Sequence, residues 1–274
     1  MLKVFSERVS RKHRKIQLFV LGVLLLLSTK VLSDDRKELE VLAMTFALGF
    51  WNQDEAAVLS TLHPALSKKG IVRNWKKSNR QVMDTLPPDR LDVLATHYNK
   101  DGRLDDLPAP KVFIRYIDQD IAAIELVNDA WFDFFQAVKI DNKWRLLNCV
   151  YGRGKDYKKT KSLSDLNAIT SVVERYMSGM LGDQEDMVRS THINLARRKI
   201  ENKNTPNVYI GFLPREQLLL NVGTFDLNKS KIKYSVTNHT NELAAVKIDF
   251  GLWREHVQLL KINEQWSIVN SFVD

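Results

Sequence analysis

The chain of 274 residues has one cysteine, Cys149, and six histidines. A single cysteine excludes a disulfide within the chain and a metal site built from cysteine thiolates. The sequence also lacks a His-x-x-x-His spacing, a glycine-rich phosphate loop and a Ser-His-Asp order. These absences leave zinc enzymes, nucleotide-binding enzymes and triad hydrolases without support, and we expect neither a metal nor a cofactor.

Long apolar runs are also missing. The longest, Leu18–Leu27, holds about ten residues, whereas a bilayer-spanning helix needs roughly 20. A basic head precedes this run, and Val31 and Ser33 stand at −3 and −1 before a cut at Ser33/Asp34. The pattern predicts a secretory signal peptide over residues 1–33, and hence an exported protein, periplasmic or secreted. The alternative is an uncleaved signal anchor in the inner membrane, which would be the chain's one membrane contact.

Positive charge is concentrated in the same segment. The whole chain carries 41 Lys and Arg against 33 Asp and Glu, a net charge of +8. Without residues 1–33 the balance is 34 against 32, a net charge of +2. A surface so close to neutral does not indicate nucleic-acid binding.

An internal repeat organises the remainder. Residues 120–152 align with residues 242–274 at a shift of 122 with eight identities in 33 positions, where composition alone would give roughly two. An upstream block repeats at a shift of 129 and pairs His63 with His192. The sequence therefore predicts two homologous domains, residues 34–153 and 165–274, joined by a polar linker over residues 154–164.

Each copy begins with helical spacing and continues with strand patterns. A helix is expected over residues 34–51, and Asp54 and Asp183 are good N-caps for the short second helix of each copy. In the first copy we expect a third helix over residues 89–98 and then four antiparallel strands: residues 111–117, 121–127, 131–140 and 144–151. The basic stretch from Lys68 to Arg80, echoed by Arg197-Arg198-Lys199, is interpreted as a solvated loop, and the alternative is a site for an acidic ligand or membrane headgroups. The fold class is α+β, with helices packed on a bent sheet.

Two motifs resemble a known family. The stretches Leu62–Ile71 (LHPALSKKGI) and Val138–Trp144 (VKIDNKW) are similar to the nuclear transport factor 2-like superfamily, in particular its bacterial lumazine-binding branch near the SnoaL-like proteins. The resemblance covers nearly all of residues 35–152 and is thinner over 165–274. It implies two tandem cone-shaped, cystatin-like domains, each enclosing a pocket, and it implies little about function because this fold hosts unrelated activities.

The third strand of the first copy is apolar on both faces. Trp131 and Phe135 share one face with Asp133, and Phe132 and Phe134 share the other with Gln136. A strand covered on both sides packs on helices and on a second sheet. Since members of the superfamily commonly form dimers, we expect an internal pseudo-dimer in which Trp131 and Trp253 mediate the contact, or else self-association through these faces.

The resemblance also suggests which residues face the pockets. We expect a small apolar or aromatic ligand among the following residues: Trp51, His63, Phe134, Gln136, Tyr176, His192, His256 and Gln258. His63 is the candidate general base and Asp133 a second catalytic candidate. The alternative for each is structural, with His63 capping a helix end and Asp133 paired with a lysine such as Lys139.

Three functions remain open at this point. The first is an exported small-molecule-binding or accessory protein without a defined reaction. The second is an acid–base enzyme of isomerase or dehydratase type that uses His63. The third is a protein-interaction module, which an exposed apolar face at Trp131 or Trp253 would favour. An enzyme requires His63 in an open cavity within hydrogen-bond reach of another polar side chain.

Overall fold

The computed structural model describes residues 34–74, 80–157, 162–203 and 205–274. The predicted signal segment 1–33 lies outside these residues, so its cleavage stays a prediction. Within the described part of the chain, no helix has both the length and the apolar character needed to cross a membrane.

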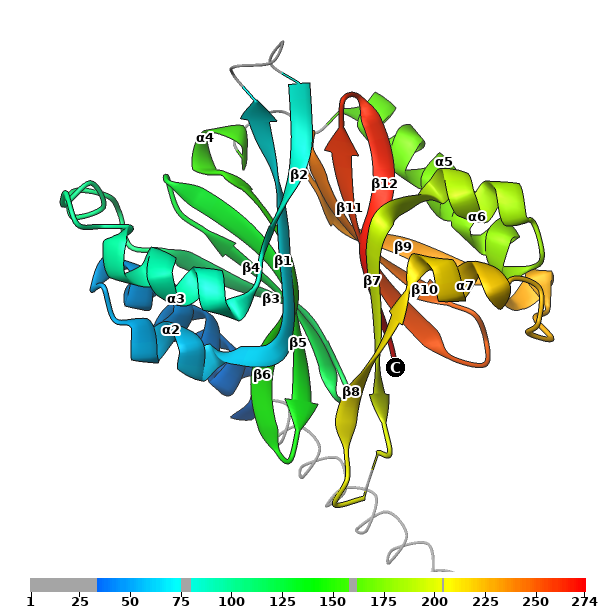
Figure 1. The fold of residues 1–274 in the computed structure, drawn as a ribbon, viewed down its shortest axis with the longest axis horizontal. Helices are drawn as coiled ribbons and strands as arrows, with labels where there is room; N and C mark the ends of the chain where they lie inside the picture. Colours follow the sequence, from blue (N-terminus) through cyan, green and yellow to red (C-terminus); the bar gives the residue numbers. More distant parts are fainter. Residues whose placement is uncertain (1–33, 75–79, 158–161, 204) are drawn as a thin grey trace, which may run out of the picture.

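Two similar units follow one another (Figure 1). The first begins with a helix over residues 34–51 and continues with α2 (Glu55–Thr61), β1 (Leu62–Asn74), β2 (Arg80–Leu86), α3 (Pro88–His97), β3 (Lys111–Asp118), β4 (Ile121–Val127), β5 (Trp131–Ile140) and β6 (Lys143–Arg153). The short helix α4 (Gly154–Tyr157) occupies the start of the predicted linker. The second unit contains α5 (Leu163–Met180), α6 (Gln184–Ser190), β7 (Thr191–Glu201), β8 (Tyr209–Pro214), α7 (Arg215–Leu220), η1 (Lys229–Lys231), β9 (Lys233–His239), β10 (Leu243–Asp249), β11 (Arg254–Ile262) and β12 (Gln265–Val273). We call the two units domain 1 and domain 2.

Each domain has one six-stranded sheet, and the two sheets have the same topology. The strand orders are β2-β1-β6-β5-β4-β3 and β8-β7-β12-β11-β10-β9. Leu62 pairs with Leu146 in domain 1, and the residues 129 and 122 positions later, Thr191 and Ile268, pair in domain 2. Equivalent registers confirm the repeat, and the α+β fold class with two tandem domains is the observed one.

The predicted basic loops are strands. β1 and β7 contain the lysine and arginine runs, and each pairs in parallel with the last strand of its domain. The sequence pattern concealed β1 because Pro64, Gly70 and two consecutive lysines interrupt any alternation of polar and apolar residues. The prediction of a solvated loop was therefore wrong for Lys68 and Lys69, which are 5% and 3% exposed, whereas Lys76 and Lys77 lie outside the described residues.

Local signals were more reliable. Asp54 and Asp183 accept hydrogen bonds from the backbone N–H groups of Ala57 and Asp186, which confirms both N-caps. The hairpin turn at Asp141 and Asn142 has positive φ at both residues, as a tight two-residue turn requires. Such features depend on a few neighbouring residues and are readable without the tertiary fold.

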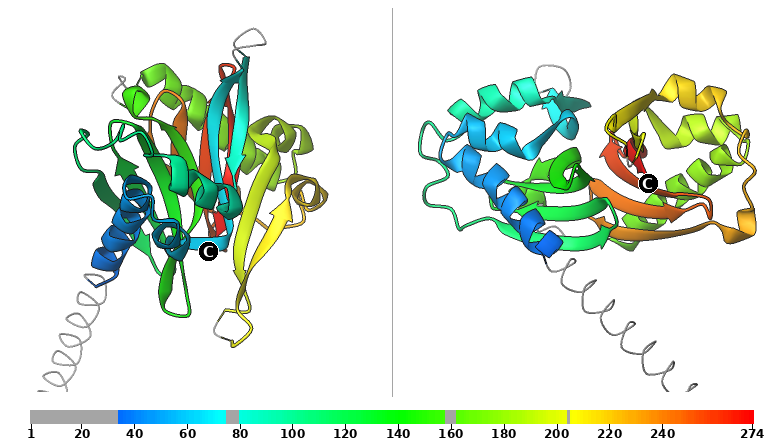
Figure 2. Two further views of the ribbon diagram at one scale, coloured as in Figure 1. Left: turned by 60° about the vertical axis from the view of Figure 1, so that its left-hand side comes forward. Right: turned by 90° about the horizontal axis from the view of Figure 1, so that it is seen from below.

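The two sheets pack face to face in the centre, and the helices cover their outer sides (Figures 1 and 2). Phe132, Phe134 and Val150 of domain 1 form one buried cluster with Leu243, Leu260 and Val269 of domain 2. The internal pseudo-dimer thus exists, but its predicted contact residues were on the wrong face. Trp131 packs against Phe50 and Tyr98 inside domain 1, and Trp253 packs against Phe225 and Phe250 inside domain 2.

Candidate functional site

The alternation of side chains along β1 and β7 separates two kinds of buried cation. Lys68 and Arg197 are equivalent at the shift of 129, and each points into its own domain. Lys69 and Arg198 follow them and therefore point to the opposite face of the sheet, toward the other domain. In each pair of consecutive cations, the first therefore lies inside its own domain and the second lies at the interface between the domains.

Inside domain 1, Lys68 forms an ion pair with Asp133, whose carboxylate is fully buried. Asp133 also accepts hydrogen bonds from the indole Nε1 of Trp131 at 3.0 Å and from the Cys149 thiol at 3.4 Å. Burial alone lowers the pKa of the Lys68 ammonium, but the Asp133 carboxylate raises it above its usual value. Lys68 therefore remains a cation at neutral pH. Asp133 is paired with Lys68 and not with Lys139, which contacts Asp35 instead.

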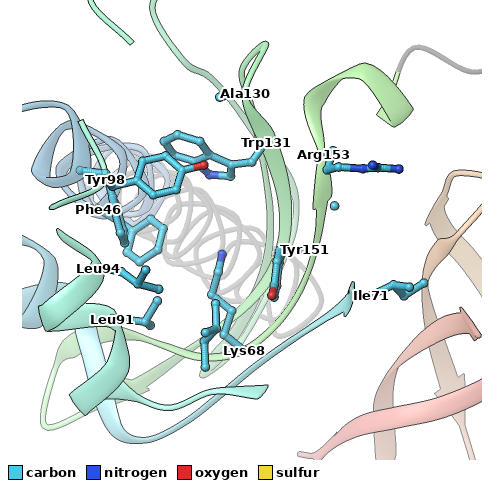
Figure 3. A pocket seen from close by; sticks show the side chains of 13 residues that line it. Phe46, Lys68, Ile71, Leu91, Leu94, Tyr98, Ala130, Trp131, Tyr151 and Arg153 are labelled. Atoms are coloured by element: carbon cyan, nitrogen blue, oxygen red, sulfur yellow. The ribbon is translucent and has the colours of Figure 1, made fainter. Parts of the chain in front are cut away.

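A cavity of about 150 Å³ lies beside this ion pair. Figure 3 shows the Lys68 ammonium between Phe46 and Tyr151, pointing toward Trp131 and Tyr98. The ammonium is 5.0 Å from the ring centre of Tyr151 and 5.2 Å from that of Phe46. The remaining wall is mostly aliphatic and aromatic, and the lining residues outside this group are Phe50, Ile71, Leu86, Leu91, Leu94, Ala130, Gly152 and Arg153. The cavity is an apolar chamber with two charged residues in its wall, Lys68, which is paired with Asp133, and Arg153, which is paired with Asp156.

Domain 2 repeats the ion pair but adds a hydroxyl group to it. Arg197 contacts Glu255 at 3.1 Å, and the Tyr176 hydroxyl donates to Glu255 at 2.6 Å. Ser271, the counterpart of Cys149, also donates to this carboxylate. Burial raises the pKa of Tyr176 well above its usual value, and the charge of Glu255 raises it further, so the phenol remains protonated. In domain 2 the side chain of Tyr176 therefore provides a hydroxyl group beside the ion pair.

Lys69 and Arg198 bind across the domain interface in an equivalent manner. The Lys69 ammonium donates to the backbone carbonyls of Asn194 at 2.6 Å and Val269 at 2.7 Å. Arg198 donates to the carbonyl of Ala65 at 2.9 Å, the position equivalent to Asn194. Burial, helped by the charge of Arg198, lowers the pKa of Lys69 to about 7. Both cations hold the two domains together rather than facing the cavity.

Two of the three predicted site histidines, His63 and His192, have the same structural contact. His63 lies at the start of β1, and its Nδ1 accepts the backbone N–H of Ala65 at 3.0 Å. The Nδ1 of His192 accepts the backbone N–H of Asn194 at 3.1 Å. Burial lowers the pKa of both imidazoles, and the neighbouring cations lower it further. Neither histidine lines the cavity.

Four other predicted residues lie in the interface between the sheets. Gln136 donates to the carbonyl of His256 at 2.9 Å, and Gln258 donates to the carbonyl of Phe134 at 2.7 Å, which is a nearly twofold-symmetric exchange. His256 stacks on Tyr116, and burial lowers its pKa to about 4. These residues are even-numbered positions of β5 and β11 and therefore face away from the cavity, whereas Asp133, at an odd position, faces toward it.

Trp51 also lies outside the cavity wall. Its indole Nε1 donates to the carbonyl of Leu104 at 3.0 Å, and its ring packs against Trp131. The residues that sequence reasoning missed are Lys68, Tyr151 and Tyr98. A signal for Lys68 was available: a cation at 68 and 197 and a carboxylate at 133 and 255 are retained in both copies of the repeat.

No protein-family profile matches the chain, and no curated protein matches it. Solved structures do match. One is a nuclear transport factor 2-like protein of unknown function from Silicibacter pomeroyi (14% identity, TM-score 0.35, 42% of this chain and 98% of that one). Another is a nuclear transport factor 2-like protein of unknown function from Shewanella baltica (16%, TM-score 0.35, 42% and 97%). A third is a nuclear transport factor 2-like protein with a cystatin-like fold from Novosphingobium aromaticivorans (10%, TM-score 0.32, 47% and 87%).

Each of these proteins covers a little under half of the chain, whose own topology shows two domains of one kind in tandem. The chain is an α+β protein of two tandem domains, and the three solved structures named above, to which it is similar, are described as nuclear transport factor 2-like proteins.

Proposed function

We propose that this protein binds one small, uncharged and largely apolar ring-shaped molecule in the domain 1 cavity and acts as a binding or accessory protein. The observation that carries the proposal is the apolar chamber of about 150 Å³ with the buried Lys68–Asp133 pair at its base. A pocket of apolar walls with few, fixed polar groups is the usual form of a small-molecule site.

Size and charge define the ligand class. A cavity of roughly 150 Å³ lined by apolar side chains is large enough for a molecule such as benzene. Aromatic walls at Phe46, Tyr98 and Trp131 favour a ring, because aromatic pairs gain energy beyond the area they bury. Lys68 and Arg153, the charged residues of the wall, are already paired with Asp133 and Asp156, so a charged ligand would lose its hydration without gaining a free counter-ion.

The acid–base enzyme is less well supported. His63, its expected base, bonds to the backbone of Ala65 and does not line the cavity. Lys68 does line the cavity, but its raised pKa keeps it protonated, which is unsuitable for a general base or a nucleophile. The interaction module is also not favoured, because Trp131 is 8% exposed and Trp253 is packed in its own domain.

Fluorobenzene is a suitable apolar probe, observed by ligand-detected fluorine NMR with the purified full chain. We expect saturable binding to the wild type. Leu94→Trp fills the cavity from helix α3 and should abolish binding, whereas Val93→Trp adds the same indole at a position 61% exposed on the same helix and should not. Absence of fluorobenzene binding, or equal binding by the two variants, would contradict a site in this cavity.

Export is part of the proposal and is supported by the basic head, the apolar run and the residues before Ser33. The test is the intact mass of protein recovered from its own host by cell fractionation. A periplasmic or secreted species beginning at Asp34 is expected. A full-length species in the membrane fraction would instead favour the signal anchor, and a full-length species in the cytoplasm would exclude export.

A further inference from the structure

The two domains differ at one helical position beside the buried ion pair. Phe46 in domain 1 corresponds to Tyr176 in domain 2, at a shift of 130 along the first helix of each domain. Phe46 is 1% exposed and Tyr176 is fully buried, so both rings lie in the core. The shift of 130 also pairs Asp35 with Asp165, which contact the equivalent Lys139 and Lys261, and Gly49 with Gly179.

The glycines fix this alignment independently. A Cβ added at Gly49 would lie 2.5 Å from Val58 Cγ2, and one added at Gly179 would lie 2.7 Å from the Cβ of Met187. Val58 and Met187 are themselves equivalent at the shift of 129. The first helix therefore crosses the second at the same point in both domains, so Phe46 and Tyr176 start from the same place relative to the ion pair.

In domain 2, the Tyr176 hydroxyl adds an oxygen at the ion pair. It donates to Glu255 at 2.6 Å, and Arg197 pairs with the same carboxylate at 3.1 Å. A phenol thus fits beside a buried cation–carboxylate pair of this protein, with its oxygen bonded to the carboxylate that the cation also contacts. Domain 2 therefore shows that a phenol group can lie next to an ion pair of this kind.

In domain 1 the corresponding hydroxyl is absent, because Phe46 ends in a ring edge. The Lys68 ammonium has three N–H donors, and its polar partners among the described residues are Asp133 and, more weakly, Cys149 at 3.7 Å. The ammonium lies on the cavity wall, pointing toward Trp131 and Tyr98 (Figure 3). A donor of Lys68 is therefore available to an oxygen atom placed in the cavity.

We propose that the Tyr176 hydroxyl occupies, in domain 2, the position that the oxygen atom of a bound ligand occupies in domain 1. The ligand is then a neutral phenol, held by its ring in the apolar chamber and by its oxygen at Lys68, with one ligand bound per chain. Because Phe46 lacks a hydroxyl group, the position of the ligand oxygen beside Lys68 is not filled by the side chain at residue 46. The inference rests on the proposed function and specifies its ligand class.

A pair of matched probes tests the oxygen contact. Fluorobenzene and para-fluorophenol share a ring and differ in one hydroxyl, so fluorine NMR titrations of the full chain compare them directly. A hydrogen bond to a charged donor should make the phenol bind about tenfold more tightly. The bound stoichiometry should be one phenol per chain.

Variants then locate the contact. Phe46→Tyr introduces the hydroxyl of domain 2 into domain 1 and should abolish the preference for the phenol. Lys68→Met combined with Asp133→Asn removes the donor without leaving a buried charge unpaired, and it should also abolish the preference while fluorobenzene still binds. Tyr176→Phe removes a hydroxyl from the other domain and should leave the phenol affinity within about twofold of the wild type.

The outcomes separate the two proposals. If neither probe binds the wild type, the proposed function is wrong and this inference falls with it. If both probes bind equally, if the preference survives in Phe46→Tyr, or if two phenols bind per chain, the cavity binds ligands but the inference is wrong. Retained phenol preference in the double variant of Lys68→Met and Asp133→Asn would likewise overturn it.

Discussion

Replacing Asp133 by asparagine should reveal how strongly domain 1 depends on its buried ion pair. The substitution retains the shape of the side chain and removes its charge, so Lys68, 5% exposed, becomes a buried cation without a carboxylate. Breaking a buried pair in this way costs ~3–5 kcal/mol, because the remaining charge is poorly solvated. The measurement is urea-induced unfolding followed by tryptophan fluorescence, since the Trp131 indole bonds to Asp133.

The double variant makes the test specific. Lys68→Met combined with Asp133→Asn removes both charges, and an apolar side chain of similar length occupies the place of the lysine. We expect the double variant to recover most of the loss and to lie within ~1–2 kcal/mol of the wild type, because replacing both partners of a buried pair is often nearly neutral.

The pH dependence gives an independent check. Without Asp133, the pKa of Lys68 in the folded state should fall below its unfolded value. The unfolded chain then binds more protons above that lowered pKa, so the stability of Asp133→Asn should increase with pH more steeply than that of the wild type. Additive losses in the double variant, together with an unchanged pH profile, would refute the account of a charge pair that stabilises domain 1.

Three further predictions concern residues outside the cavity. Lys69 has a folded pKa of about 7, below its unfolded value, so the unfolded chain binds more protons above pH 7. Wild-type stability should therefore rise between about pH 7 and 10, and Lys69→Met should flatten that rise in urea titrations at a series of pH values. Gln258→Leu should lower the unfolding free energy by ~2–3 kcal/mol, because it leaves the interface carbonyl of Phe134 without its donor; a loss below ~0.5 kcal/mol would show that the interface network is dispensable. His63→Ala should leave fluorobenzene affinity within about twofold of the wild type, since His63 does not line the cavity, and a tenfold loss would return it to the site.

Much of the fold was accessible from the sequence because its signals are local or repeated. Helix caps such as Asp54 depend on residues a few positions away, and the hairpin at Asp141 depends on two. The repeat adds an independent argument, since one shift aligns Trp144 with Trp266 and Asn148 with Asn270. The predicted alternation of side chains along β5 was also correct, since Asp133 lies on one face of the sheet and Gln136 on the other.

The strands β1 and β7 could not be predicted in the same way. Their consecutive cations resemble a solvated segment, and only the partners reveal why the charges are tolerated. Those partners lie far along the chain, since Lys68 is 65 positions from Asp133 and Lys69 is 200 from Val269. Local propensity contains no information about contacts at such separations, and the outcome is decided by the satisfaction of buried charges.

The sequence by itself determined two copies of one α+β unit, their helices and hairpins, and the two-faced central strand, because periodicity, caps and internal repetition are properties of neighbouring or aligned residues. The tertiary structure alone decided which face of that strand meets the other domain, and which side chains surround the cavity of domain 1. A single residue alternation along β1 directs Lys68 into domain 1 and Lys69 across the interface, and a single hydroxyl distinguishes Tyr176 from Phe46.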